Sequence, residues 1–169
     1  MRQHRAILLL AALVIGFCGC VRTEGKPMDF EHAFYEEETN AVGHITRRYY
    51  LCPENGERLC VGESFGYEID DYIVDLDGDG ISELVCNCTF GADGTRRVYV
   101  FRIRDGKVER GTLAPDAVIL PDFINRGAAA QEFYNAESGD FCLQYSTANG
   151  IRKAHFTYGD LRFEAFELK

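Results

Sequence analysis

The sequence lacks the short motifs that identify several large enzyme classes. It contains no His-Glu-x-x-His zinc motif, no Walker-type phosphate loop and no dinucleotide-binding fingerprint. It also lacks any helical pattern long enough to build an α/β fold, and it has no tryptophan. The apolar run over residues 6–17 is too short to cross a bilayer, which takes about 20 residues. Metalloprotease and nucleotide-dependent activities therefore have no support in the sequence.

The N-terminus predicts a signal peptide over residues 1–19. Arg2 and Arg5 give a basic start, the apolar run follows, and a small residue then precedes Cys20. This order resembles the bacterial lipoprotein signal, in which Cys20 becomes the acylated first residue of the mature chain. We therefore expect an extracytoplasmic protein that is anchored to the bacterial cell membrane by its lipid. Ordinary secretory cleavage, with Cys20 incidental, is the alternative.

A second segment, residues 20–40, is polar and acidic and is expected to be a tether between the lipid and the folded domain. A short helix over residues 29–38 is the only structure that we expect within it. The remaining residues, 41–169, are expected to form one all-β domain, because about 150 residues after cleavage suffice for one core.

The chain is acidic, and this limits its partners. Without Arg2 and Arg5 it has 16 basic and 27 acidic side chains, a net charge of −11. No basic patch remains, which argues against nucleic acid as a partner. Anionic lipid head groups would repel such a surface, so contact with the membrane is expected through the N-terminal lipid alone.

Residues 75–83 carry the clearest chemical signal. Four carboxylates, those of Asp75, Asp77, Asp79 and Glu83, lie within nine residues at positions 1, 3, 5 and 9. Position 7 is Ile81, whose carbonyl completes a set of five oxygen ligands, and a glycine at position 6 allows a sharp turn. Such a set suits Ca²⁺, a hard cation that prefers oxygen. The alternative is an Asp- and Gly-rich turn that binds no ion.

The flanks of this loop distinguish it from an EF-hand. Position 12 is Cys86, a poor ligand for a hard ion, and the residues on both sides are strand-like. A strand, Asp-x-Asp-Gly-Asp-Gly-x-x-Glu-Leu-Val and a second strand resemble the FG-GAP or VCBS-like repeat over about residues 70–113. The resemblance implies Ca²⁺ between the first two strands of a four-stranded blade. Only one copy is present, and a propeller needs at least four blades, so it implies the site and the local strands alone.

The rest of the chain consists of strand-like runs separated by turns. Asp105-Gly106 and Asn149-Gly150 are strong hairpin signals. Along residues 97–104, apolar side chains point to both faces, which predicts a strand covered on both sides. We expect two antiparallel meanders of about four strands, packed as a sandwich or a rolled sheet. The expected strands are residues 45–52, 59–61, 83–90, 96–104 and 107–113, then 131–136, 141–147, 151–157 and 161–168.

Five cysteines remain after Cys20, so they cannot all pair with one another. Cys52 and Cys60 flank a turn-rich segment, and a disulfide across that hairpin is expected in an oxidising compartment. Cys86 and Cys88 alternate with apolar residues along one strand, which indicates small core residues and not a redox or soft-metal site. The pairing of Cys142 is left open: either it forms a disulfide with Cys86 or Cys88, or all the cysteines are reduced.

One catalytic pattern occurs, Gly62-Glu-Ser64-Phe-Gly66. In hydrolases the central serine lies on a tight strand-to-helix turn, but here a strand-like segment follows. A small envelope hydrolase that uses Ser64, with His155 downstream, is therefore an alternative function. A purely structural envelope component is another. The function that we expect is a calcium-stabilised module, not an enzyme, that binds a protein or glycan partner at the envelope.

Overall fold

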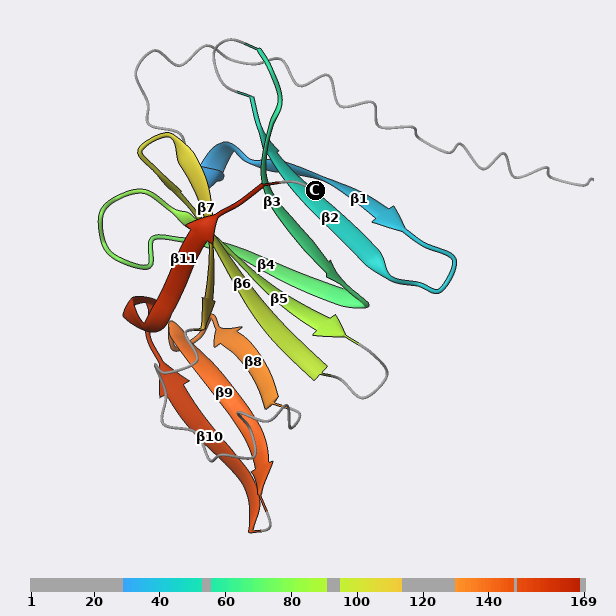
Figure 1. Cartoon of the computed structure of the whole chain (residues 1–169), viewed down its shortest axis with the longest axis vertical. Coiled ribbons are helices and arrows are strands. Elements are labelled where there is room, and N and C mark those ends of the chain that lie inside the picture. The colour runs from blue at the N-terminus through green and yellow to red at the C-terminus, as the bar shows by residue number, and fades with distance from the viewer. Residues whose placement is uncertain (1–28, 53–55, 91–94, 114–129, 148, 168–169) are drawn as a thin grey trace, which may run out of the picture.

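The computed structural model describes residues 29–52, 56–90, 95–113, 130–147 and 149–167, and this part of the chain is all-β. Its eleven strands form three antiparallel sheets, and it also contains two short 3-10 helices (Figure 1). This confirms the predicted fold class. The expected signal peptide, Cys20 and the first residues of the expected tether lie outside the described residues. Within them, no helix is long and apolar enough to span a membrane.

The N-terminal sheet has the order β1-β2-β3, formed by β1 (Phe34–Thr39), β2 (Ile45–Leu51) and β3 (Leu59–Gly66). A 3-10 helix, η1 (Phe30–His32), precedes it. Both η1 and β1 fall in the segment expected to be a tether, and β1 replaces the expected helix. The reason is packing: Phe30 is fully buried, and Glu36 and Glu37 lie opposite Arg48 and Arg47 on β2. The folded domain therefore begins before residue 41.

The central sheet has five strands in the order β11-β7-β6-β5-β4. The C-terminal sheet has three, in the order β10-β9-β8. The strands of the central sheet are β4 (Glu68–Val74), β5 (Glu83–Phe90), β6 (Thr95–Arg104), β7 (Lys107–Leu113) and β11 (Leu161–Ala165). Those of the C-terminal sheet are β8 (Ala130–Asn135), β9 (Asp140–Thr147) and β10 (Gly150–Phe156).

The arrangement differs from the expected two four-stranded meanders in two ways: β1–β3 form a sheet of their own, and the last strand leaves the C-terminal sheet. The expected hairpin turn after β10 is instead the 3-10 helix η2 (Tyr158–Asp160), in which the Asp160 carboxylate accepts from the backbone N–H of Thr157 at 2.7 Å. This turn directs β11 back to β7. Gly111 on β7 lies opposite Phe163 on β11, and a Cβ on Gly111 would approach that ring to 2.7 Å. The glycine therefore makes room for the added strand.

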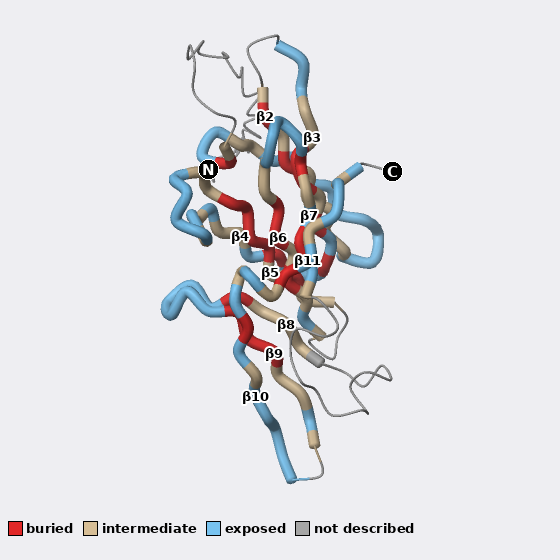
Figure 2. The backbone as a smooth tube through the Cα atoms, turned by 60° about the vertical axis from the view of Figure 1, so that its left-hand side comes forward, coloured by how far each residue is buried: buried red, intermediate tan, exposed pale blue. Residues whose placement is uncertain are grey.

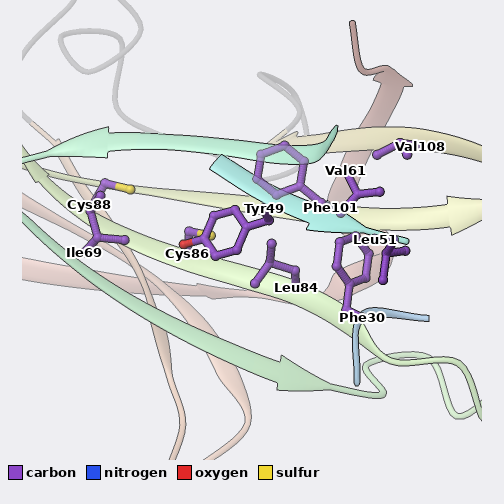
Figure 3. Close-up of a cluster of buried hydrophobic side chains, with 10 residues drawn as sticks. All are labelled: Phe30, Tyr49, Leu51, Val61, Ile69, Leu84, Cys86, Cys88, Phe101 and Val108. Atoms are coloured by element: carbon purple, nitrogen blue, oxygen red, sulfur yellow. The ribbon is translucent and has the colours of Figure 1, made fainter. Parts of the chain in front are cut away.

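The central sheet is buried on both faces, as the pattern along residues 97–104 predicted. One face contributes Leu84, Cys86 and Phe101 to a cluster with the N-terminal sheet, which we call the first core cluster (Figure 3). The other face contributes Val85 and Val100 to a second core cluster with the C-terminal sheet. Figure 2 shows the buried residues gathered in the middle of the molecule, with many of them on β3, β5 and β6, whereas the far end of the β9–β10 hairpin is exposed.

A side-chain amide fixes the C-terminal sheet to the central one. Asn87 on β5 donates to the carbonyl of Tyr134 on β8 and accepts from the N–H of the same residue, each at 2.8 Å. The Asn87 side chain thus satisfies both the N–H and the carbonyl of Tyr134, as a neighbouring strand would do at that position.

We predict that Asn87→Ala destabilises the fold by about 2–4 kcal/mol, because two hydrogen bonds are lost and the backbone groups of the buried Tyr134 are left without partners. Urea unfolding measures this loss. Thr89→Ala, two residues along the same strand, is the matched control and should cost much less. Equal losses in the two variants would contradict the role assigned to the amide.

Candidate metal centre

The acidic loop connects β4 to β5, and its backbone turns where the sequence places glycine. Val74 and Glu83 are the last and first paired residues of the two strands, so the loop caps their hairpin. Gly78 and Gly80 have φ angles of 78° and 86°, in the left-handed region that a side chain disfavours. The two glycines, on either side of Asp79, thus allow the loop to turn tightly there.

Three of the five predicted ligands come together. One carboxylate oxygen from each of Asp75, Asp77 and Glu83 lies within 4.8 Å of the other two. Asp75 and Asp77 are exposed, whereas Glu83 is only 3% exposed at the start of β5. Asp79, which is also described, lies outside this group of three. The carbonyl of Ile81 stays a predicted ligand.

Backbone N–H groups hold the carboxylates in place. Asp75 accepts from Gly78 at 2.8 Å through one oxygen and from Gly80 at 3.0 Å through the other. Asp77 accepts from the N–H of Asp79 at 3.2 Å, and Asp79 accepts from that of Ile81 at 2.7 Å. The loop is therefore ordered by its own acidic side chains.

Glu83 is the buried member of the group. Its Oε2 atom accepts from the N–H of Leu76 at 2.8 Å, and its Oε1 atom accepts from the hydroxyl of Tyr158 at 3.4 Å. Burial raises the pKa of Glu83 to about 7; the charges of Asp77, Asp79 and Asp75 act in the same direction, against the hydrogen bond from Leu76. A nearby cation would favour the ionised form instead.

The donor set fits a hard divalent cation. All the converging ligand atoms are carboxylate oxygens, and the burial of one of them leaves a negative charge that water does not fully solvate. When bound, a calcium ion would supply the opposite charge. Asp75, Asp77 and Glu83 are the residues that would hold it.

The sequence analysis missed two features near acidic groups. Tyr158 contacts Glu83 across 75 positions, and no local pattern announces that contact. Asp29, Glu31 and His32 also bring three ligand atoms together. There, Asp29 caps η1 by accepting from the N–H of Glu31 at 3.0 Å, and it lies 3.1 Å from Nδ1 of His32, which accounts for the cluster without an ion.

The Gly-x-Ser-x-Gly pattern lies within the continuous strand β3, not on a strand-to-helix turn. Ser64 is 1% exposed, and its hydroxyl shares a hydrogen bond of 3.2 Å with that of Tyr49. Packing accounts for both glycines: a Cβ on Gly66 would lie 2.8 Å from the carbonyl oxygen of Thr89, and one on Gly62 would lie 3.3 Å from Phe101. The surroundings of Ser64 are those of a core residue.

The expected disulfide between Cys52 and Cys60 is not formed, since the Cys60 thiol donates to the carbonyl of Gly62 at 3.5 Å. A bulge between Tyr49 and Tyr50 shifts the register of β2 against β3, so Cys60 lies opposite Tyr50. Cys52 follows Leu51, which lies opposite Leu59, so Cys52 and Cys60 are not facing positions of the hairpin.

The other cysteines are core residues, as predicted for two of them. Cys86 and Cys88 are fully buried in the first core cluster, and burial raises the pKa of both thiols. The Cys86 thiol donates to the Tyr49 hydroxyl at 3.5 Å, and Figure 3 shows these two side chains together. Cys142, on β9, is a thiol like Cys86 and Cys88, so neither expected pairing is formed.

Comparisons of this chain with protein-family models, with curated proteins and with solved structures find no match.

The raised pKa of Glu83 predicts a pH dependence of stability when a chelator is present. The unfolded-state pKa is near 4.5 and the folded-state pKa is about 7. The stability that protonated Glu83 contributes is therefore full below about pH 4.5 and is lost as the pH rises through 7, by up to about 3 kcal/mol. Urea unfolding in chelator between pH 5 and pH 8 measures it.

Glu83→Gln should remove this part of the pH dependence, because the amide keeps the shape of the side chain but cannot titrate. Glu68→Gln, an exposed position on β4, is the matched control and should keep the wild-type slope. A Glu83→Gln protein that loses as much stability as wild type between pH 5 and pH 8 would contradict the assignment.

Proposed function

We propose that this protein is a bacterial envelope lipoprotein whose β domain is stabilised by Ca²⁺ and serves as a binding module. The observation that carries the proposal is the convergence of Asp75, Asp77 and Glu83 in a single loop, with Glu83 buried. Carboxylates held this close repel one another unless a cation or a proton lies between them.

The strands around the loop support the proposal. β4, β5, β6 and β7 follow one another in sequence and are neighbours in the central sheet, with the acidic loop between the first two. A four-stranded meander with its cation loop in that position is the arrangement that resemblance to the FG-GAP or VCBS-like repeat implies for residues 70–113. The other strands, which join or cover this meander, have no counterpart in that repeat.

The role of the cation would be structural. It would neutralise a charge that the fold itself buries at the first residue of β5, and a ligand that binds only the folded state stabilises that state by mass action. Asp75 and Asp77 are exposed, so the ion could enter from solvent without opening the core.

A binding role is favoured over catalysis because Ser64, the one serine in a hydrolase-like pattern, is buried. Exposed aromatic side chains offer a surface for a partner instead: Phe65 is 38% exposed and Tyr67 is 39% exposed, and both pack on His44, with ring centres 4.9 and 4.2 Å from it. Aromatic rings suit protein or glycan partners because they bring large contact areas at a low cost in entropy. The acidic chain does not suit nucleic acid.

Anchoring would place this module outside the cytoplasm, at the membrane. The lipid on Cys20 would hold the chain, and the folded domain would begin by Phe30. Only a short stretch, residues 21–29, would then separate the lipid from the domain, which keeps the domain close to the membrane surface.

Calorimetric titration with Ca²⁺ tests the cation site. We expect one site, with a Kd on the order of 10⁻⁴–10⁻³ M, as in extracellular modules. Asp77→Ala should abolish binding, since it removes one of the three converging carboxylates. Asp70→Asn, an exposed acid on β4 outside the loop, should leave binding unchanged. Correctly folded wild-type protein that gives no heat at millimolar Ca²⁺ would refute the site.

Membrane fractionation tests the anchor. Cys20→Ala should move the protein from the membrane fraction to the soluble one, because acylation would be lost. Cys18→Ala is the matched control and should stay with the membrane, because Phe17 is a poor residue before an acylated cysteine. A Cys20→Ala protein that remains in the membrane fraction would show that the anchor is elsewhere.

A further inference from the structure

The residue that completes the surroundings of Glu83 comes from the far end of the chain. Tyr158 is the first residue of η2, the turn that carries the chain from β10 of the C-terminal sheet to β11 of the central sheet. Its hydroxyl lies 3.4 Å from Oε1 of Glu83 and 3.4 Å from a guanidinium nitrogen of Arg102 on β6.

The chemistry of these three groups fixes the direction of the hydrogen bonds. Arginine can only donate, so the Tyr158 oxygen accepts from Arg102. The single hydroxyl proton of Tyr158 is then available for the hydrogen bond to Glu83, and a carboxylate oxygen of Glu83 accepts that hydrogen bond. Arg102 is itself held by Glu109, at 2.7 Å, and lies over the ring of Phe163, 3.7 Å from its centre. The chain of hydrogen bonds therefore runs from Arg102, which is itself held in place, through Tyr158 to the buried carboxylate of Glu83.

An apolar contact joins the same two regions. Leu76 lies between the ligands Asp75 and Asp77, and its side chain packs against the second core cluster. That cluster holds Phe141 and Phe156 of the C-terminal sheet, and Tyr158 and Phe163 pack against it as well. The backbone N–H of Leu76 also donates to Glu83. The acidic loop and η2, the turn that follows the C-terminal sheet, therefore pack against the same apolar cluster, to which that sheet contributes Phe141 and Phe156.

We propose that Tyr158 is a positioning residue for the Glu83 ligand, and that it couples cation binding at the acidic loop to the attachment of the C-terminal sheet. This inference rests on the proposed function, because it assigns a second effect to the same site. A cation held by Asp75, Asp77 and Glu83 fixes the carboxylate to which Tyr158 donates. Opening of the β10–η2 junction breaks that hydrogen bond and weakens the site, and linkage makes the effect reciprocal.

Native-state hydrogen exchange followed by mass spectrometry tests the coupling in the full chain. Exchange is compared with Ca²⁺ at about 100 times its Kd and with chelator, in wild type and in Tyr158→Phe. The phenylalanine keeps the ring that packs 5.2 Å from Phe163 and loses only the hydroxyl. Tyr35→Phe, at a 51% exposed tyrosine on β1 of the N-terminal sheet, is the matched control.

In wild type, we expect Ca²⁺ to slow exchange in the loop and in β8–β10 by up to about a hundred-fold, the limit set by mass action at that ligand concentration. The β1–β2 hairpin, which belongs to the N-terminal sheet, should change less. In Tyr158→Phe, protection of the loop should remain, the Ca²⁺-dependent protection of β8–β10 should fall sharply, and the Kd for Ca²⁺ should rise roughly three- to ten-fold. Tyr35→Phe should behave as wild type.

The outcomes separate the two proposals. If Tyr158→Phe binds Ca²⁺ with the wild-type Kd and keeps the wild-type Ca²⁺-dependent protection of β8–β10, the role of Tyr158 is overturned and the cation site still stands. Protection confined to the loop in wild type would do the same. Absence of any Ca²⁺ binding in wild type would remove the site itself, and the coupling with it. Loss of exchange protection in Tyr158→Phe that is equal with Ca²⁺ and with chelator would reduce Tyr158 to a packing residue.

Discussion

The fold depends on a central sheet in which two of the inner strands, β5 and β6, are apolar on both faces. On β5, Leu84, Cys86 and Cys88 point to one side and Val85 to the other, and β6 divides in the same way between Phe101 and Val100. A strand of this kind cannot face water on either side, so the chain must supply two covers. The N-terminal sheet is one and the C-terminal sheet is the other, and the three-sheet arrangement follows from that requirement.

Each cover is fixed by polar contacts as well as by apolar ones. On the N-terminal side, Arg47 on β2 donates to Asp71 on β4 and to the carbonyl of Ile69. On the C-terminal side, Asn87 holds Tyr134 and Glu83 accepts from Tyr158. Apolar burial is non-directional, whereas a buried hydrogen bond is lost if the partner strand slips by one residue. These contacts therefore set the register in which each cover packs.

The sequence predicted what is local and missed what is distant. Hairpins at Asp105-Gly106 and Asn149-Gly150, the strands beside them and the two-sided burial of β6 followed from turn chemistry and alternation. The return of β11 to β7 did not, because it depends on the η2 turn and on space at Gly111. β1 was missed because three consecutive glutamates resemble a tether until Arg47 and Arg58 are known to pair with two of them. At the loop, spacing found the acids, but the burial of Glu83 depends on the third sheet.

The position of Glu83 explains why its burial is inseparable from the fold. Glu83, Val85 and Asn87 alternate along β5, so they share the face that meets the C-terminal sheet. The apolar residue in the middle drives the two sheets together, and that contact desolvates the polar residues on either side of it. Asn87 finds both its partners on β8, as a neutral amide can. Glu83 finds one hydroxyl and one N–H, which leave its charge unneutralised, and carboxylate oxygens of Asp75 and Asp77 lie within 4.8 Å of its own. The docking of the third sheet thus creates the demand for a proton or a cation that the acidic loop is placed to meet.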